Sequence, residues 1–410
     1  MKITDLKKPL AITMWDSSWI RRRYAGGGVE NYSEVVGELV ERGYNAVRID
    51  AFPHLIAKDI YGQARESFFD PPGISWQKYA FAIWGNQWTT NIYPRRDLIE
   101  FMRACQEKDV YVGLSTWLKP TIEVTNEQIY GAEGVVRIWD ETLKFLEEND
   151  CLKNVLYVDV LNEFPGGTCF PWLNNNLNNM KHPKMEGRQC NKEQIKFLQS
   201  FIDTVIAKLK ALWPELSFAA SINYFKDLHP YLDYSSFDFL DFHRWAYMDD
   251  AFARKFLDVG YNEILSFGDP AHFYVDTAEQ GAYNGGGRLL PGDINFGLIN
   301  DRIRKAWEEN RESAIEWLES EVSYAASLGR ELGIPVGCTE GWGPLLWFEH
   351  PLLDWDVVKD AGEIGARLGA KYGYAFNCQS NECEPQFIRL WRDIDYHKKV
   401  TDIIKNGKIG

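Results

Sequence analysis

Two stretches of the chain are the most informative about its fold: Val155-Leu-Tyr-Val-Asp-Val-Leu-Asn-Glu163 and Val336-Gly-Cys-Thr-Glu340. Each is a short run of mostly apolar residues that ends at a glutamate, and each is followed by turn residues, Pro165 in the first and Gly341 in the second. Short apolar runs bounded by turn residues are typical of strands buried in a parallel sheet. The sequence therefore predicts two buried strands with a carboxylate at the carboxyl end of each.

Similar runs recur along the whole chain and alternate with stretches of helical periodicity. The strands are expected at 10–15, 44–50, 110–117, 155–161, 216–222, 239–243, 336–339 and 372–376. Between them, helices are expected at about 35–43, 135–148, 192–212, 299–333 and 356–370. One more helix is expected to begin after Asp97, which would cap it, and a loop is expected at 165–190. Such alternation favours a parallel sheet with crossover helices.

Eight strands predict the α/β class and a single (β/α)8 TIM barrel over residues 1–410. Long insertions are expected after strands 2 and 6, at about 51–94 and 246–298. A doubly wound dinucleotide-binding sheet is the rival fold. It lacks support because neither glycine triplet, 26–28 or 285–287, forms G-x-G-x-x-G between a strand and a helix.

Composition excludes several classes of function. The net charge is −14, from 45 basic and 59 acidic residues, which argues against a nucleic acid partner. No apolar run approaches the roughly 18 residues that a membrane span needs, so we expect no membrane partner. Residues 1–10 lack the apolar core of a signal peptide. The 7 cysteines are an odd number and scattered, so they do not indicate a disulfide framework. We therefore expect a cytoplasmic location. The sequence does not indicate an oligomeric state.

Aromatic residues are numerous, with 16 Trp, 20 Tyr and 23 Phe. Most of these rings are expected in the core, but several lie next to turn residues where a strand should end. Flat rings in such places suit a ligand with apolar faces and a hydroxylated rim. A carbohydrate is the partner that fits this description.

The two strand-end glutamates carry the chemical argument. In a (β/α)8 barrel the catalytic residues lie at the carboxyl ends of the strands, and strands four and seven face each other across that mouth. Cleavage of a glycosidic bond needs a carboxylic acid to protonate the leaving oxygen and a second carboxylate for the anomeric carbon. Glu163 and Glu340 are therefore predicted to be catalytic, although either one alone could be an ordinary surface residue at a loop.

Four strand-end motifs together resemble a known clan. They are Arg48 in Val-Arg-Ile, Asn162-Glu163, His243 in His-Arg-Trp245, and Thr339-Glu340-Gly341. They resemble the retaining (β/α)8 glycoside hydrolases, in the cellulase-like branch related to glycoside hydrolase family 5, and the resemblance spans nearly the whole chain. It implies hydrolysis of β-glycosidic bonds by double displacement, with Glu163 as acid/base, Glu340 as nucleophile and Asn162 on the sugar 2-hydroxyl.

Each role has a physical requirement. An acid that works at neutral pH needs a raised pKa, which an apolar site and the nearby charge of Glu340 would supply to Glu163. A nucleophile must stay ionised, and Arg48 could keep Glu340 so. The residues leave a second interpretation of Arg48 open, a structural ion pair with Asp50 or Asp159.

The chain also departs from the family 5 pattern. The usual His-x-Tyr on strand six, whose Tyr touches the nucleophile, is replaced by a motif that ends in Trp245, so either Tyr247 takes that role or Glu340 relies on Arg48 alone. The usual Trp after strand eight is absent, and Asn377 is the residue expected there as a sugar contact or a turn residue.

Other strand ends supply further substrate-binding predictions: Trp15, Asp16, Trp117 and Trp342. Each tryptophan has an alternative place in the core or in a lid. His243 has no second His or Cys at ligand spacing, and the sequence contains neither H-E-x-x-H nor paired C-x-x-C, so no metal and no other cofactor is predicted.

Three rival functions share parts of this pattern. A sugar-binding barrel without catalysis would not need both glutamates, and a transglycosylase would use the same residues. A metal-dependent sugar isomerase would need several acidic and His ligands that the strand ends do not offer. The two long insertions favour a pocket for short oligosaccharides or β-glycosides over an open cleft.

Overall fold

The computed structural model describes residues 2–70, 90–121, 123–124, 129–165, 169–180, 191–223, 232–246, 296–344, 349 and 351–410. Eight strands of this part of the chain form one parallel sheet. They are β1 (Leu10–Asp16), β2 (Ala46–Asp50), β5 (Tyr111–Ser115), β6 (Val155–Asp159), β7 (Phe218–Ala219), β8 (Leu240–Asp241), β10 (Val336–Cys338) and β12 (Phe376–Asn377). The predicted (β/α)8 barrel is confirmed.

The strands follow one another around the barrel in chain order. The first strand pairs with the last, with Leu10 opposite Phe376. The two ends of the order, β7 and β8, meet at a parallel bridge between Ile222 and Phe242. The sheet is therefore nearly closed, and the carboxyl ends of all eight strands lie at the same mouth.

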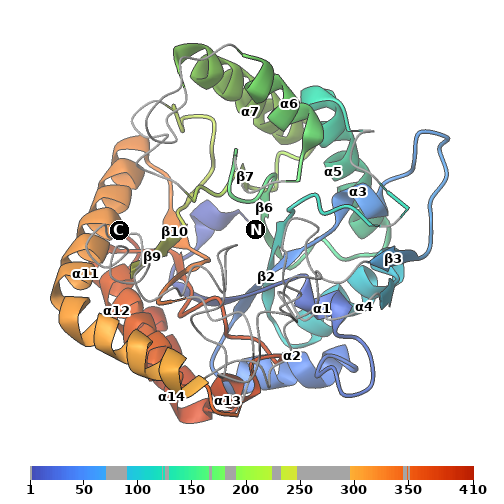
Figure 1. The fold of residues 1–410 in the computed structure, drawn as a ribbon. Coiled ribbons are helices and arrows are strands. Elements are labelled where there is room, and N and C mark those ends of the chain that lie inside the picture. Colours follow the sequence, from blue (N-terminus) through green and yellow to red (C-terminus); the bar gives the residue numbers. More distant parts are fainter. Residues whose placement is uncertain are drawn as a thin grey trace, which may run out of the picture.

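Helices connect the strands and surround the barrel (Figure 1). The longer ones are α2 (Tyr32–Glu41), α4 (Pro94–Glu107), α5 (Gly131–Glu148), α7 (Lys192–Leu212), α11 (Phe296–Leu332), α12 (Asp356–Tyr372) and α14 (Ile394–Lys405). The shorter elements are η1 (Ile3–Asp5), α1 (Ser18–Arg21), α3 (Pro53–Ile56), α6 (Pro171–Asn179), α13 (Ile388–Trp391), and the pairs β3 (Phe68–Asp70) with β4 (Thr90–Ile92) and β9 (Arg244–Trp245) with β11 (Gly341–Trp342). Among the described helices, none is long and apolar enough to cross a membrane.

Aromatic rings fill the interior of the barrel. The rings of Tyr157 and Phe376 have centroids 5.7 Å apart, and Phe239 lies 4.6 Å from Tyr157. Two glycines on the strands make this packing possible. A Cβ on Gly113 would lie 2.4 Å from the ring of Tyr157, and a Cβ on Gly337 would lie 2.4 Å from the ring of Phe376. The interior of the barrel is thus a packed core.

The last barrel strand lies later in the chain than predicted. Strand eight is predicted over 372–376, but Tyr372 still belongs to α12, and β12 begins at Phe376. Gly373 explains the difference: it ends α12 in the left-handed region, with φ +85°, and its N–H donates to the carbonyl of Gly369. Glycine adopts that conformation without a Cβ clash, so the helix extends up to it.

Proline sets two helix starts that the prediction misses. Asp97 does not cap its helix, because α4 begins at Pro94 and Asp97 lies within the first turn. The segment 165–190 is not wholly loop, because α6 begins at Pro171. In both helices the proline occupies the first turn, where its missing N–H needs no partner.

Both predicted insertions extend beyond the described residues. After β2, the described part of the insertion contains α3 and the antiparallel pair β3–β4, while residues 71–89 lie outside it. After β8, residues 247–295 lie outside the described chain, and α11 begins at Phe296.

Candidate active site

Glu163 and Glu340 are brought together at the mouth of the barrel. Glu163 follows β6 and Glu340 follows β10, and the two residues are 7% and 2% exposed. One carboxylate oxygen of each residue and a ring nitrogen of His243 all lie within 4.8 Å of one another. Glu163 has φ +52°, a left-handed conformation that is uncommon outside glycine and often marks functional sites.

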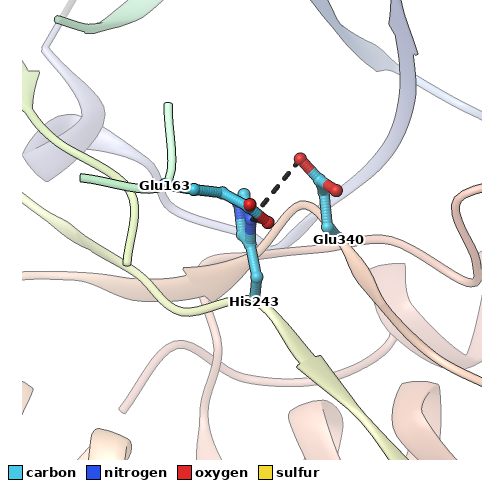
Figure 2. A group of neighbouring side chains, drawn as sticks. All are labelled: Glu163, His243 and Glu340. Atoms are coloured by element: carbon cyan, nitrogen blue, oxygen red, sulfur yellow. Dashed lines mark hydrogen bonds and ion pairs between the residues drawn. The ribbon is translucent and has the colours of Figure 1, made fainter. Parts of the chain in front are cut away.

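The imidazole of His243 contacts both carboxylates (Figure 2). Its Nδ1 lies 3.0 Å from Oε1 of Glu163 and 3.4 Å from Oε1 of Glu340. Its Nε2 lies 3.2 Å from the hydroxyl of Thr339 and 3.7 Å from a carboxylate oxygen of Asp241. The same Nε2 also lies 3.1 Å from an amino group of Arg48. Burial alone would lower the pKa of His243, but Glu340, Asp241 and Glu163 have the larger, opposite effect, so the pKa lies well above its usual value.

Arg48 is fully buried and has two acidic partners. One amino group donates to Asp16 at 2.7 Å and also to Oε1 of Glu340. The other donates to the hydroxyl of Thr339 at 2.8 Å. The alternative partners considered from the sequence, Asp50 and Asp159, are not its ion pairs among the described residues. A guanidinium with several donors can serve two carboxylates at once.

The pKa values of the two glutamates are shifted in opposite directions. Burial is the largest effect on Glu163, and together with the charge of Glu340 it raises the pKa of the acid. Burial acts in the same direction on Glu340, but the positive charges of Arg48 and His243 outweigh it and lower the pKa. At neutral pH this environment favours a protonated Glu163 more than a protonated Glu340.

Asn162 lies between the two strand ends. Its Nδ2 is 3.4 Å from Oε1 of Glu340, and its Oδ1 accepts a hydrogen bond from Ser221 at 3.0 Å. The amide NH2 of Asn162 is thus oriented toward Glu340, and its contact with the sugar 2-hydroxyl stays a prediction.

Three residues predicted as sugar contacts, Trp15, Trp342 and Asn377, have side chains that are bonded to or packed against other parts of the protein. Trp15 is fully buried and donates to the backbone oxygen of Cys383. Trp342 packs against Gly365 of α12, and the amide of Asn377 donates to the carbonyl of the same glycine. Successive residues of a strand point to opposite faces, so a residue at a strand end can face the surrounding helices instead of the mouth.

Three other predicted residues do lie at the site, bonded to its polar groups. The indole of Trp117 donates to Oδ2 of Asp16 at 2.7 Å. The indole of Trp245 donates to Oδ1 of Asn381 at 3.1 Å. Asp16 therefore joins Arg48 to Trp117, and both of its oxygens are occupied by protein donors. Tyr247 lies outside the described residues.

Asn381 is the site residue that the sequence analysis misses. It lies beyond β12, and its Nδ2 donates to Oε2 of Glu340 at 2.8 Å. The available signal was the polar run Gln379-Ser-Asn-Glu382, which follows strand eight at the mouth and is buried throughout. A buried polar run of this kind must find partners within the protein.

One group of side chains in the described chain has its ligand atoms close enough together to hold a metal ion: Glu163, His243 and Glu340. A cation there would lie next to the guanidinium of Arg48, which donates to Glu340. It would also have to displace the proton from His243, whose raised pKa favours the charged ring. The donor set therefore fits an acid–base site better than a metal centre.

The barrel fold and the match to a cellulase-like family model identify the class as the cellulase-like (β/α)8 glycoside hydrolases. The chain belongs to the cellulase-like family, because the model of the family described as "Sugar-binding cellulase-like" matches residues 12–405. The resemblance inferred from the strand-end motifs is therefore confirmed. No curated protein sequence matches the chain.

Solved structures agree with this family. The chain is similar to a protein of Parabacteroides distasonis that was solved as a candidate glycoside hydrolase: the identity is 28%, the TM-score is 0.79, and 98% of this chain and 95% of that chain are covered. A family 5 xyloglucanase from Paenibacillus pabuli shares the fold, with 9% identity and a TM-score of 0.51 over 98% of each chain.

Proposed function

We propose that the protein is a retaining glycoside hydrolase of β-glycosidic bonds, with Glu163 as general acid/base and Glu340 as nucleophile. The observation that carries the proposal is the pair of buried carboxylates at one barrel mouth, with Arg48 donating to Glu340 and His243 in contact with both. This arrangement raises the pKa of Glu163 and lowers that of Glu340. Cleavage by double displacement needs one protonated and one ionised carboxyl group. Arg48 supplies the asymmetry, because it donates to Glu340 and, among the described residues, forms no ion pair with Glu163, whereas His243 contacts both glutamates.

In the first step, Glu340 attacks the anomeric carbon and Glu163 gives its proton to the glycosidic oxygen. The bond between the anomeric carbon and that oxygen breaks, and the oxygen leaves with the bonding electrons as a hydroxyl group. A covalent ester between the sugar and Glu340 remains. As Glu340 loses its charge, His243 keeps its contact with the now ionised Glu163.

In the second step, Glu163 acts as a base. It takes a proton from a water molecule whose oxygen attacks the anomeric carbon, and the ester bond to Glu340 breaks. Glu340 is released as a carboxylate and Glu163 is again protonated. Two successive inversions give net retention of the β configuration.

The spacing of the carboxylates supports retention. The nearest oxygens of Glu163 and Glu340 lie within 4.8 Å. Retaining enzymes have carboxyl groups about 5–5.5 Å apart, whereas inverting enzymes need roughly 6.5–9.5 Å to hold a water between base and sugar. Direct attack by Glu340 suits the narrower arrangement.

For the substrate we propose short oligosaccharides or β-glycosides. The support is the length of the insertions at about 51–94 and 246–298, since long βα loops usually form binding loops or lids. A long soluble glucan and short oligosaccharides would be compared as substrates. Faster release of internal fragments than of terminal sugar units would contradict the proposal.

The activity is tested with a panel of aryl β-glycosides, using the wild type and Glu340→Gln. We expect turnover by the wild type and loss in the variant, with unchanged thermal unfolding as the control for folding. Binding of sugars without turnover by the wild type would instead indicate a sugar-binding barrel. Preferential transfer of the glycosyl group to an added sugar would indicate a transglycosylase.

A further inference from the structure

The side chain of Asn381 is held at both ends of its amide. Its Oδ1 accepts the backbone N–H of Gly341 at 2.9 Å and the indole N–H of Trp245 at 3.1 Å. Its Nδ2 donates to Oε2 of Glu340 at 2.8 Å. The side chain is fully buried. It therefore connects the segments that follow three strands, β8, β10 and β12, through one amide group.

These partners fix which way the amide points. The N–H groups of Gly341 and Trp245 can only donate, so the oxygen of Asn381 must face them, and the NH2 group must face Glu340. A flipped amide would place its NH2 group against two donors and its oxygen against a carboxylate. The contact with Glu340 is thus specified by the neighbours of Asn381 and does not depend on the carboxylate itself.

The two oxygens of Glu340 have different surroundings. Oε1 is shared by Arg48, His243 and Asn162. Within the described chain, the hydrogen bond to Oε2 comes from Asn381. A carboxylate bonded through both oxygens is fixed in rotation about its last bond, and each donor favours the ionised form.

We propose that Asn381 is a positioning residue that holds Glu340 in its attacking orientation and keeps it ionised, with Trp245 and Gly341 fixing the amide. This inference rests on the role of Glu340 proposed above. It also gives the unusual Trp245 a role, because the third residue of the strand-six motif then acts on the nucleophile through Asn381 without touching it. Neither residue needs to contact the sugar for this purpose.

The substitution Asn381→Asp tests the contact while keeping its surroundings. Aspartate retains an acceptor for Gly341 and Trp245 but replaces the donor to Glu340 by a second oxygen, usually charged. We expect kcat on an aryl β-glycoside to fall about 10²-fold, the scale for losing one preorganised donor, with KM changed far less. The acid limb of the pH profile should move up by about one unit or more, because a like charge disfavours ionisation.

The matched control is Asn377→Asp, the same change in the same segment. Asn377 is also buried, but its amide donates to Gly365 in α12 and lies away from Glu340. In the Asn377→Asp variant, the acid limb of the pH profile should stay where it is in the wild type, even if the variant is less stable. Trp245→Phe provides a second variant, which keeps an aromatic ring but removes one donor to Asn381, and it should shift the limb upward by less than Asn381→Asp. Thermal unfolding is measured for all variants.

Carbon NMR of protein with ¹³C-labelled glutamate carboxyls separates this inference from the proposed function. The Glu340 signal is assigned by its loss in Glu340→Gln, and its pKa is then followed in the wild type and in Asn381→Asp. A raised pKa of Glu340 in the variant supports the positioning role, even if the wild type hydrolyses no glycoside and the proposed function fails. The contrary result is an active wild type together with a folded Asn381→Asp variant in which neither the acid limb of the pH profile nor the pKa of Glu340 has moved. That result would overturn the positioning role of Asn381 and leave the proposed function standing.

Discussion

The ends of β6 and β10 present the same residue type in different electrostatic surroundings. Glu163 and Glu340 are both buried, and both contact the same imidazole. The difference is Arg48, which donates to Glu340. Burial raises the pKa of Glu163, while positive charge overcomes the same burial at Glu340. The difference in pKa is therefore set by the position of a few charges, because residue type and burial are the same at both sites.

Two buried histidines show the same dependence of pKa on neighbouring charges, for a side chain that is positive when ionised. His243 lies among three carboxylates, and its pKa is well above the ordinary value. His54 is also buried, but its Nε2 contacts a neutral group, the backbone oxygen of Lys119, at 2.7 Å. Burial therefore lowers the pKa of His54 to about 4. The same desolvation acts on both rings, and the neighbouring charges decide the outcome.

The largest expected effect follows from removing the nucleophile. Glu340→Ala should lower kcat on the order of 10⁶-fold, the scale for loss of a nucleophile. Added azide should restore turnover by attacking from the vacated side, and the product should be an α-glycosyl azide. Proton NMR of the product distinguishes the anomers. A β-glycosyl azide from this variant would mean that the two roles are reversed.

Removal of the acid should have a smaller and more selective effect. In the wild type, kcat/KM should be bell-shaped in pH, because Glu340 must be ionised and Glu163 protonated, with both limbs belonging to the coupled pair. Glu163→Ala should lower the rate by about 10²–10⁴-fold with poor leaving groups and far less with good ones. The alkaline limb should disappear for good leaving groups, and azide should give a β-glycosyl azide. A retained alkaline limb would place the acid elsewhere.

The smallest effect concerns stability. Because the pKa of His54 is about 4 in the folded protein and near 6.5 when unfolded, the unfolded state gains the proton first as pH falls. The contribution of His54 to stability is therefore present at pH 7 and lost progressively from about pH 6.5 toward pH 4.

Denaturant unfolding of the wild type and His54→Gln at pH 7 and pH 5 measures this contribution. Between these pH values, the free energy of unfolding should fall by about 2 kcal/mol less in the variant than in the wild type. An equal fall in both proteins would show that burial does not depress the pKa of His54.

The sequence predicts the strand-end polar groups well. Each of Arg48, Glu163, His243 and Glu340 follows or lies in a short apolar run, and the barrel brings the carboxyl ends of such runs together. Local pattern and fold class are therefore sufficient to place these four side chains at one mouth. The identity of their partners, such as Asp16 for Arg48, depends on rotamers that the sequence does not reveal.

The orientation of side chains near strand ends is harder to predict. Trp15 and Asn377 are adjacent in sequence to mouth positions, yet the pleat turns them toward the helices. Asn381 is four residues beyond the end of β12, and it reaches Glu340 only because its loop folds back over the mouth. Contacts of this kind depend on tertiary structure, so local periodicity cannot find them.

Trapping of the covalent intermediate shows directly which glutamate is the nucleophile. The wild type is treated with an activated 2-fluoro β-glycoside, which slows release of the sugar from the nucleophile, and peptic peptides are analysed by mass spectrometry. We expect a single fluoroglycosyl adduct on the peptide that contains Glu340, with the label on that residue. A label on Glu163 or any other carboxylate, or turnover to an α-configured first product without an adduct, would contradict it.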